Sequence, residues 1–306
     1  MNYLFSIIIP TFNGEKSIGG LLEKITHFSS NYSKETIIID SGSNDGTLDI
    51  INSYRSKIAY LKLIEINKKE FNHGLTRNLG VKIAKGKYIC FFSQDAKPIS
   101  KRFLDYYLED FKIDKKIKAI YGKHIYYLNT PIIQKIESDC FWSKLDPYLN
   151  KKGVLIKNIS HEFVPFNKRN KYLWYEVSDT SSCYQRDFLL KNPFPRTMYG
   201  EDMMAGKAII DSGLSIVYDT RCSVKHSHSY SLFEYYKREK ESVGLVINGM
   251  KLRKKTNFIC KLEKVMNLKM PYYKKIYYFG ELVVYYFLKL LILAILKIEA
   301  GMNRRT

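Results

Sequence analysis

The chain has 306 residues, of which 45% are hydrophobic and 14% aromatic, and its formal net charge is +20. This composition excludes a disordered chain, and the length predicts one large domain or one domain with a C-terminal appendage. The positive charge predicts attraction to the phosphates of a nucleotide, a nucleic acid or an anionic membrane, unless it reflects only solvated lysine-rich faces.

Apolar strands and amphipathic helices alternate through the first hundred residues. We predict strands at 5–10, 36–40, 61–66 and 88–92, and helices at 17–28, 48–54 and 75–84. Continuous apolar strands that alternate with helices predict an α/β fold, with a central, mainly parallel sheet flanked by helices. In such sheets ligands bind at the carboxyl ends of the strands, so the polar residues that follow each strand are the candidates for a site.

The pattern is less regular beyond residue 100. We predict a helix at 103–111, strands at 119–121, 215–218 and 222–226, and a helix that begins at the GED triplet of residues 200–202. Residues 129–175 are aromatic and irregular, and their pattern orders no elements. Five cysteines are scattered without a C-x-x-C pair, and no basic leader precedes the first strand, which predicts reduced thiols in a cytoplasmic protein without a signal peptide.

The C-terminal segment differs in kind from the rest. Residues 251–275 are dense in Lys and Arg, and the almost wholly apolar run LVVYYFLKLLILAIL follows at 282–296. This run is short for a membrane span and contains Lys289. A basic segment beside an apolar helix predicts a helix that lies in the membrane interface, with a core or oligomer helix as the alternative.

The loop DSGSNDGT at residues 40–47 follows the second predicted strand. It fails as a calcium-binding loop, because Gly46 falls one place late and Ile51 stands where a closing Glu is needed. It suits a strand-to-helix turn, since two glycines permit a tight backbone and Asp45 can cap the next helix. Asp40, at the end of the strand, could also accept a hydrogen bond from a nucleotide base.

Several other polar stretches could carry chemistry. The chain has no Walker A motif and no G-x-G-x-x-G, while FNHGLTRN at 71–78 offers Arg77 to a diphosphate or a base. Glu201 and Asp202 begin a helix. Acids in a first helical turn either interact favourably with the helix dipole or can supply a general base. Asp95 ends the fourth strand, and alone it is a poor metal ligand, but His226 or His228 could join it.

Taken in order, these stretches resemble the family 2 glycosyltransferases of the GT-A fold. The resemblance runs through IIIPTFNGE, IIIDSGSNDGT, TRNLGVKIAKGKYICFFSQDA, YGED and HSHSYS. The details EFNHGLTRN, SQDAKP and VKHSHSYS look most like the bacterial rhamnosyltransferase branch, which uses dTDP-L-rhamnose to build O-antigen, capsule or other surface polysaccharides. The resemblance implies inverting transfer from a nucleotide sugar, with Mg²⁺ or Mn²⁺ on the diphosphate, to a lipid-linked saccharide at the cytoplasmic face of the inner membrane.

The resemblance also implies a role for each matched residue. Asp202 matches the general base of the ED motif, and Glu201 supports it. Asp95 matches the second acid of the D-x-D motif, whose first acid is replaced here by Ser93, and His226, or less favourably His228, matches a histidine that completes the metal shell. The residues at nucleotide-sugar-binding positions are Thr11, Asn13, Asp40, Arg77, Ser93 and Gln94, with Asp40 on the pyrimidine base.

Two alternatives stay open at the level of sequence. The same chemistry could use a UDP-hexose or UDP-N-acetylhexosamine donor, and a non-catalytic module that binds nucleic acid or membranes belongs to a different class. We expect no nucleic-acid partner, and the oligomeric state is not predicted. The predicted organisation is a GT-A domain at 1–248, with a nucleotide-binding half at 1–100 and an acceptor-binding half at 101–248, followed by a basic and apolar helical extension at 249–306.

Overall fold

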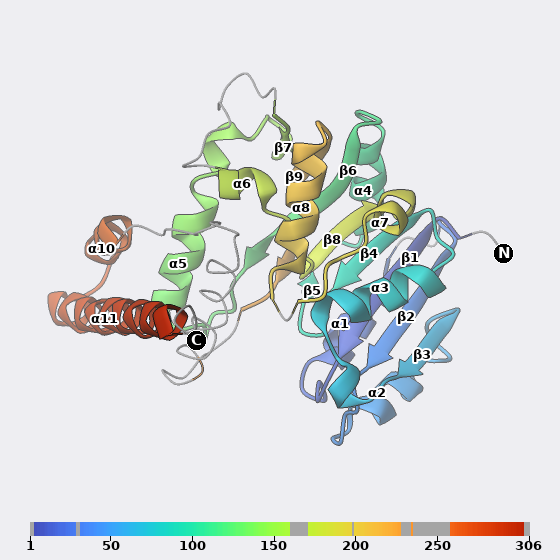
Figure 1. Ribbon diagram of the computed structural model, residues 1–306, viewed down its shortest axis with the longest axis horizontal. Helices are drawn as coiled ribbons and strands as arrows, with labels where there is room; N and C mark the ends of the chain where they lie inside the picture. Colours follow the sequence, from blue (N-terminus) through green and yellow to red (C-terminus); the bar gives the residue numbers. More distant parts are fainter. Residues whose placement is uncertain are drawn as a thin grey trace. The chain divides into compact units, whose positions relative to one another are not determined.

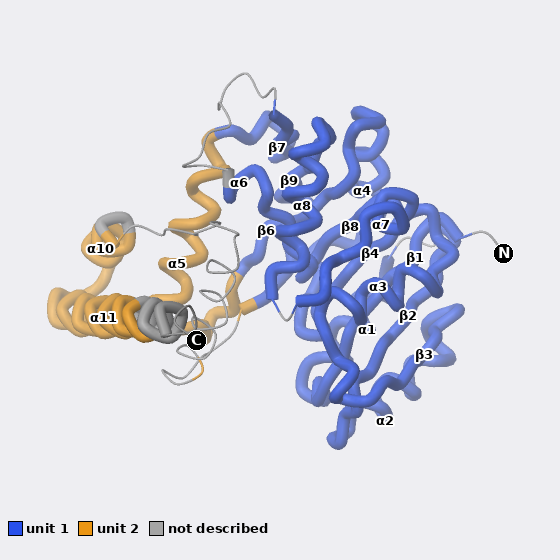
Figure 2. Tube along the Cα trace, in the orientation of Figure 1, with its two compact units in different colours: residues 1–125, 148–226 blue, residues 126–147, 227–306 orange. Residues whose placement is uncertain are grey.

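The computed structural model describes residues 3–28, 31–159, 171–197, 199–227, 234 and 258–302. The chain divides into two compact units, residues 1–125 with 148–226 and residues 126–147 with 227–306 (Figure 2). This division by contacts differs from the predicted boundary between residues 248 and 249, because a helix from the middle of the chain packs with the C-terminal helices.

The described part of the first unit is built on a nine-stranded sheet (Figure 1). Its strands are β1 (Phe5–Thr11), β2 (Lys34–Asp40), β3 (Leu61–Glu65), β4 (Tyr88–Phe92), β5 (Lys97–Pro98), β6 (Ile117–Ile125), β7 (Val154–Lys157), β8 (Ser181–Gln185) and β9 (Ser215–Lys225). The order is β3-β2-β1-β4-β8-β6-β9-β5, and β7 pairs with β9 off this path. Strands β5, β7 and β8 run against the other six, so the sheet is mainly parallel, as predicted.

Helices cover both faces of this sheet. Helices α1 (Ile18–Thr26), α2 (Thr47–Ser53) and α4 (Phe103–Phe111) supply side chains to the core on one face. Helices α3 (His73–Ile83), α7 (Arg186–Lys191) and α8 (Glu201–Asp211) lie on the other, where the short α6 (Lys171–Tyr175) packs on α8. In β4, Cys90 and Phe92 belong to the first core, whereas Phe91 meets Tyr184 and Phe194 on the opposite face. Burial on both faces explains why the strand is apolar throughout.

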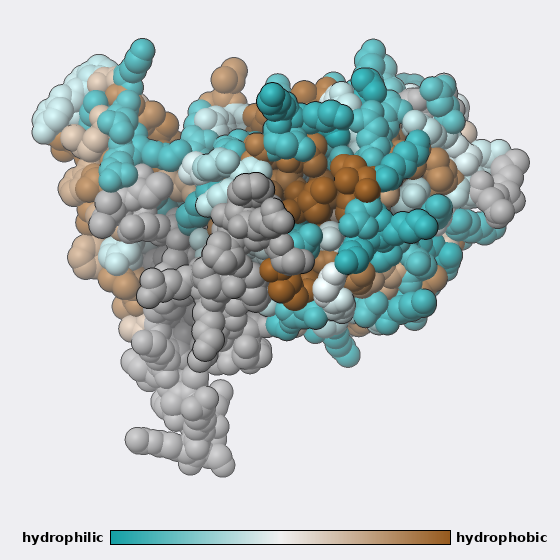
Figure 3. Space-filling model, turned by 90° about the horizontal axis from the view of Figure 1, so that it is seen from above, coloured by the Kyte–Doolittle hydropathy of each residue, from teal (hydrophilic) through white to brown (hydrophobic). Residues whose placement is uncertain are grey.

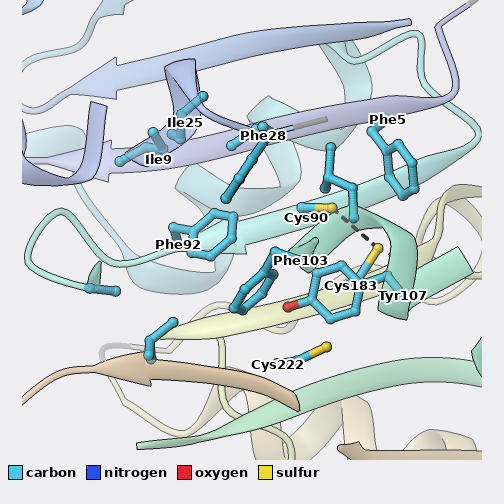
Figure 4. Close-up of a cluster of buried hydrophobic side chains, with 14 of the residues drawn as sticks. Phe5, Ile9, Ile25, Phe28, Cys90, Phe92, Phe103, Tyr107, Cys183 and Cys222 are labelled. Carbon is cyan, nitrogen blue, oxygen red and sulfur yellow. Dashed lines mark hydrogen bonds between the residues drawn. The ribbon is translucent and has the colours of Figure 1, made fainter. Parts of the chain in front are cut away.

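Aromatic rings and thiols fill the core between the sheet, α1 and α4 (Figure 4). The rings of Phe28 and Phe103 stack with centroids 5.9 Å apart, and Tyr107 meets Phe103 edge-on. Cys90 and Cys183 are directly opposite in the β4–β8 pair, with Sγ atoms 3.3 Å apart, too far for a disulfide bond of about 2.05 Å. The four cysteines whose side chains are described are free thiols.

The second unit contains helices α5 (Ile132–Trp142), α10 (Phe258–Met266) and α11 (Tyr272–Met302). A small core of Ile133, Ile136, Cys140, Val265 and Leu282 joins the three helices. Helix α11 includes the predicted apolar run 282–296. No helix in the described ranges has both the length and the apolar character needed to cross a membrane.

The predicted elements of the first hundred residues are confirmed, with ends that differ by a few residues. A single strand, β9, replaces the two strands predicted at 215–218 and 222–226. Strand β6 covers Ile117–Ile125, whereas the prediction was 119–121. The sequence analysis predicted no elements for residues 129–175, where the structure has α5, β7 and α6. It also did not predict β8 and α7, which follow this region. Hydrophilic residues predominate among the coloured atoms of the face shown in Figure 3, interrupted by hydrophobic patches.

Candidate active site

The polar residues that follow β1, β2, β4 and β9 gather at one edge of the sheet, because these strands are parallel and their carboxyl ends coincide (Figure 1). Strand β8 runs in the opposite sense, so its first residues lie at the same edge. Helix α8 also begins here, since it leads back to the amino end of β9. Loops from distant parts of the chain therefore meet at this edge.

The loops after β1 and β2 are joined by side chain–backbone hydrogen bonds. The Asn13 amide donates to Ser43 Oγ at 2.8 Å, and Asn13 Oδ1 accepts from the Asn44 amide at 3.0 Å. The Gly14 amide donates to Thr47 Oγ1 at 2.7 Å. Asn13 has a φ of 45°, a left-handed conformation that Asn tolerates better than most residues. The two loops thus hold each other in one conformation.

Asp40 is fully buried and organises the loop that follows it. Its Oδ1 accepts from the amides of Gly42 at 3.0 Å and Ser43 at 2.8 Å. Its Oδ2 accepts from Thr11 Oγ1 at 2.9 Å and Ser43 Oγ at 2.6 Å. The turn needs Gly42, whose φ is +81°. The structure thus places Asp40 and Thr11 beneath the loop, with the carboxylate engaged by four donors.

Ser93, Gln94 and Asp95 continue from β4. The Gln94 side chain pairs with the backbone of Phe12, accepting from its amide at 3.0 Å and donating to its carbonyl at 3.1 Å. The Ser93 amide donates to the Thr180 carbonyl at 3.2 Å. Gln94 therefore fixes the loop after β1 to the loop after β4, and the strand order brings both beside the start of β8.

Asp95 and His226 come together from distant parts of the first unit's sequence. The antiparallel pairing of Lys97 with Lys225 brings β5 beside β9 and sets Asp95 Oδ1 3.4 Å from His226 Nε2. Their side chains are 28% and 11% exposed, respectively. Two ligands of one octahedral Mg²⁺, each about 2.1 Å from the ion, lie about 3 Å apart, so this pair fits a single divalent ion.

A third ligand from the protein is not visible at this pair. Among the residues that the structure describes, no three His, Cys, Asp or Glu side chains are grouped so as to hold a metal. Ser93 stands where the D-x-D motif has its first acid, and His228 lies outside the described residues. One carboxylate and one imidazole suit an ion that takes its other ligands from water and phosphate oxygens.

Arg77 lies in the first turns of α3 and is almost wholly buried, with 6% of its surface exposed. Its Nη1 is 2.8 Å from Glu201 Oε1. Its Nε is 3.0 Å from Asp179 Oδ2, as an ion pair without the alignment of a hydrogen bond. Its guanidinium also lies over the Phe91 ring, at 5.8 Å. The structure thus places Arg77 between two buried carboxyl groups.

Burial dominates the ionisation of these carboxyl groups. It raises the pKa of Asp179 to about 6; the Arg77 guanidinium opposes this shift, and the negative charge of Asp202 adds to it. Burial also raises the pKa of Glu201, against the same opposing effect of Arg77. Asp179 and Glu201 therefore share one buried guanidinium.

Asp202 differs from Glu201 in its surroundings. Gly200 precedes the pair with a φ of 77°, so that the chain turns sharply into α8. The Asp202 carboxylate accepts from the Met203 amide at 2.7 Å and, through its other oxygen, from the Asp179 amide at 3.4 Å. Asp202 is half-buried whereas Glu201 is buried, so Asp202 is the acid better placed to take a proton from a ligand.

Asp179 was not among the residues predicted for this site. It lies just before β8, in the stretch SDTSSC, and the sequence offers no periodic pattern there. The one available signal is an acid followed by small polar residues, and these residues begin the buried strand β8. Only the reversed direction of β8 brings it to the edge where the other acids lie.

Comparisons of the sequence point to one family. The family model described as Glycosyl transferase family 2 matches residues 6–163. The O-antigen chain rhamnosyltransferase WbaN of Salmonella anatum is 29% identical over 237 residues, which cover 76% of this chain and 69% of that protein. RfbN of Salmonella typhimurium, with the same description, is 27% identical over 249 residues, with the same two shares.

Comparisons of the structure agree on the fold. Mannosyltransferase PcManGT from Pyrobaculum calidifontis, in complex with GDP-Man and Mn²⁺, has a TM-score of 0.60 at 14% identity and covers 99% of this chain and 81% of its own. TarS 1–349 from S. aureus, in complex with UDP, has a TM-score of 0.56 at 18% identity and covers 92% and 71%. These likenesses confirm the predicted GT-A fold.

Proposed function

The chain is a member of glycosyl transferase family 2, and from this premise we propose that it moves L-rhamnose from dTDP-L-rhamnose to a saccharide of a bacterial surface polysaccharide, with inversion. The observation that carries this proposal is the arrangement at the carboxyl ends of the strands, where the Asp95–His226 pair follows β4 and β9 and the half-buried Asp202 begins α8. The matches to two O-antigen chain rhamnosyltransferases support the choice of sugar and pathway.

Asp202 acts as the general base in this proposal. It takes the proton of the acceptor hydroxyl as that oxygen attacks the anomeric carbon from the face opposite the leaving group. The bond between the anomeric carbon and the diphosphate oxygen breaks, and its electron pair leaves with the nucleoside diphosphate. A single displacement inverts the anomeric centre without a covalent sugar–protein intermediate. Glu201, bound to Arg77, keeps the start of α8 in place.

Asp95 and His226 would hold a divalent cation, Mg²⁺ or Mn²⁺. When bound, such an ion neutralises the charge that develops on the departing diphosphate. The complex of PcManGT with GDP-Man and Mn²⁺ is consistent with this assignment. Both side chains are partly exposed and close enough to share one ion, which supports them as its protein ligands.

The nucleotide would lie over the loops after β1, β2 and β4. Thr11, Asp40 and Gln94 contribute by shaping these loops, since their side chains are hydrogen-bonded to other parts of them. The exposed loop residues, Asn13 among them, are then the ones that face the nucleotide directly. Ser93, which stands in place of an acid, leaves the D-x-D motif with one carboxylate.

We place the acceptor, a lipid-linked saccharide, at the cytoplasmic face of the inner membrane, with helix α11 on the membrane surface. One side of α11 carries Leu282, buried against α5 and α10. The opposite side exposes apolar and aromatic residues, including Tyr277, Phe287 and Leu291. Residues 251–275 are rich in Lys and Arg, which suits anionic lipid headgroups, and tyrosines are common at membrane interfaces.

A donor screen with a base variant tests the transferase proposal. We expect release of dTDP from dTDP-L-rhamnose in the presence of lipid-linked acceptor extract, and a fall of about 10²- to 10⁴-fold in Asp202→Asn. The matched control is Asp211→Asn at the far end of α8. In the wild type the Tyr175 hydroxyl donates to Asp211 Oδ1 at 2.9 Å, and Asn can still accept this hydrogen bond. UDP-glucose, UDP-galactose and UDP-GlcNAc are screened alongside.

The outcomes separate the parts of the proposal. Turnover of a UDP-sugar with none of dTDP-L-rhamnose would retain the chemistry and overturn the donor; a S. aureus TarS neighbour in complex with UDP-GlcNAc makes this the alternative to screen. Full activity in Asp202→Asn would contradict the assignment of the base. Failure to consume or bind any nucleotide sugar would contradict the proposal as a whole.

A further inference from the structure

Arg77 and Asp179 form a buried pair beside the proposed base. Asp179 is 1% exposed, and its Oδ1 accepts from Ser182 Oγ at 2.7 Å and Tyr184 Oη at 2.9 Å. Its other oxygen lies against Arg77 Nε at 3.0 Å. A carboxylate held by two hydroxyls and a guanidinium has little freedom to move, so the backbone at residue 179 is fixed as well.

This fixed backbone reaches Asp202. The Asp179 amide donates to Asp202 Oδ2 at 3.4 Å, while the Met203 amide holds the other oxygen. Arg77 also binds Glu201, the residue immediately before Asp202, at 2.8 Å. One guanidinium thus connects to the proposed base by two routes, through the backbone of Asp179 and through the first turn of α8.

Burial makes this connection sensitive to charge. Arg77, Asp179 and Glu201 are each 6% exposed or less, so their charges are weakly screened by water. Removal of the guanidinium would leave two buried carboxyl groups without their cation, which is costly. The arrangement therefore requires all three groups, and a change in one alters the field at Asp202.

We propose that Asp179 and Arg77 are positioning residues that orient Asp202 and set the charge around it. Arg77 then acts on the base rather than as a contact of the donor, the role that the sequence resemblance implied for it. This inference rests on the proposed function, because it assumes that Asp202 is the base. It assigns to the start of β8 a part in catalysis that the motif pattern does not show.

The test is the kinetics of Asp179→Asn in the full chain. Asn retains an oxygen for the Ser182 and Tyr184 hydroxyls and keeps the backbone amide, but it removes one negative charge. We expect kcat to fall about 10- to 100-fold, as for other small misplacements of a catalytic group, with the KM for the donor unchanged. We also expect the acid limb of the kcat profile to move to lower pH, because the negative charge that Asp179 carries above its pKa of about 6 is lost beside Asp202.

Arg77→Lys is the second variant, and it distinguishes the two roles of Arg77. Lys keeps the charge but cannot reach both carboxyl groups as a planar fork. We expect a lower kcat with the donor KM unchanged. A raised donor KM with kcat retained would overturn the inference in favour of a direct donor contact. Arg77→Lys also serves if Asp179→Asn does not fold, which thermal unfolding detects.

Asp202→Asn separates this inference from the proposed function. If Asp202→Asn keeps its activity, the base assignment fails and the inference fails with it. If Asp202→Asn is inactive while Asp179→Asn has a wild-type kcat and an unmoved acid limb, only the positioning role is overturned. A loss of stability in Asp179→Asn without a change in the acid limb would identify a structural role alone.

Discussion

At the scale of single residues, the environment decides what each acid can do. Glu201 and Asp202 are neighbours in sequence. Glu201 is buried and forms an ion pair with Arg77, whereas Asp202 is half-buried and accepts hydrogen bonds from two backbone amides. Asp40 is an acid at a strand end like Asp95, yet four donors saturate it. The type of residue is therefore a poor guide to its role unless its partners are known.

Asp95→Ala tests the proposed metal pair. Of the two proposed protein ligands of the ion, Asp95 is the carboxylate. We therefore expect the Mn²⁺ concentration needed for half-maximal transfer to rise at least about tenfold in Asp95→Ala. The measurement is initial rate against Mn²⁺ after treatment with a chelator. The matched control is Asp114→Ala, an exposed acid before β6, at the opposite edge of the sheet.

An unchanged dependence on Mn²⁺ in Asp95→Ala would show that the ion, if one is used, is held elsewhere. An equal rise in Asp114→Ala would show a general effect of lost negative charge.

At the scale of elements, the proposed function depends on the direction of strand β8 and on the two sides of helix α11. Strand β8 is inserted antiparallel between β4 and β6, which brings Asp179 to the carboxyl edge. Helix α11 is apolar on the side that faces away from its partner helices as well as on the side that packs. Apolar residues on a helix are normally covered, and in our proposal the membrane surface covers the exposed side of α11.

Phe287→Glu with Leu291→Glu tests α11 as a membrane-binding helix. The two side chains are 65% and 55% exposed, and a spacing of four residues puts them on the same side of the helix. We expect co-sedimentation with vesicles that contain anionic lipid to be lost in the double variant, because both apolar area and charge attraction are reduced. Folding is checked by circular dichroism.

The control for this test is Ile113→Glu with Leu128→Glu, which adds the same charge and removes exposed apolar residues elsewhere. If the control weakens vesicle binding as much, net charge alone explains the effect. If neither variant weakens it, α11 is not the binding element.

At the scale of the whole molecule, two buried ionisable groups shape the dependence of stability on pH. Burial, with the nearby charge of Asp219, raises the pKa of Asp110 to about 8. The folded state then binds more protons than the unfolded state between about pH 4 and 8, and the free energy of unfolding falls as the pH rises through this range. Lys157 has the opposite effect at higher pH.

Lys157 in β7 is fully buried, and its Nζ lies 2.9 Å from the Tyr121 hydroxyl and within 3.0 Å of the carbonyls of Leu173 and Glu176. Burial lowers its pKa to about 7, against an opposing effect of Glu176. The unfolded state binds more protons between pH 7 and about 10.5, so the free energy of unfolding rises with pH there.

We expect the urea midpoint to rise between pH 8 and 9.5 in the wild type and to rise less in Lys157→Met. The slope with pH is the readout, since the variant also loses hydrogen bonds and has a lower midpoint throughout. The exposed Lys152→Met, in the turn before β7, is the control and keeps the wild-type slope. If Lys157→Met keeps the wild-type slope, a group other than Lys157 takes up the proton when the protein unfolds.

The sequence by itself determined the alternation of strands and helices, the end of the sheet at which we expect ligands to bind, and the acids near the ends of strands. These depend on hydrophobic periodicity over five to ten residues, which is a local property. The resemblance to the family already paired Asp95 with His226, which the structure places together, but only the tertiary structure decided that Arg77 meets Asp179 and Glu201. Such pairs depend on strand order, direction and register, which arise from the packing of the whole sheet and leave no periodic trace in the chain.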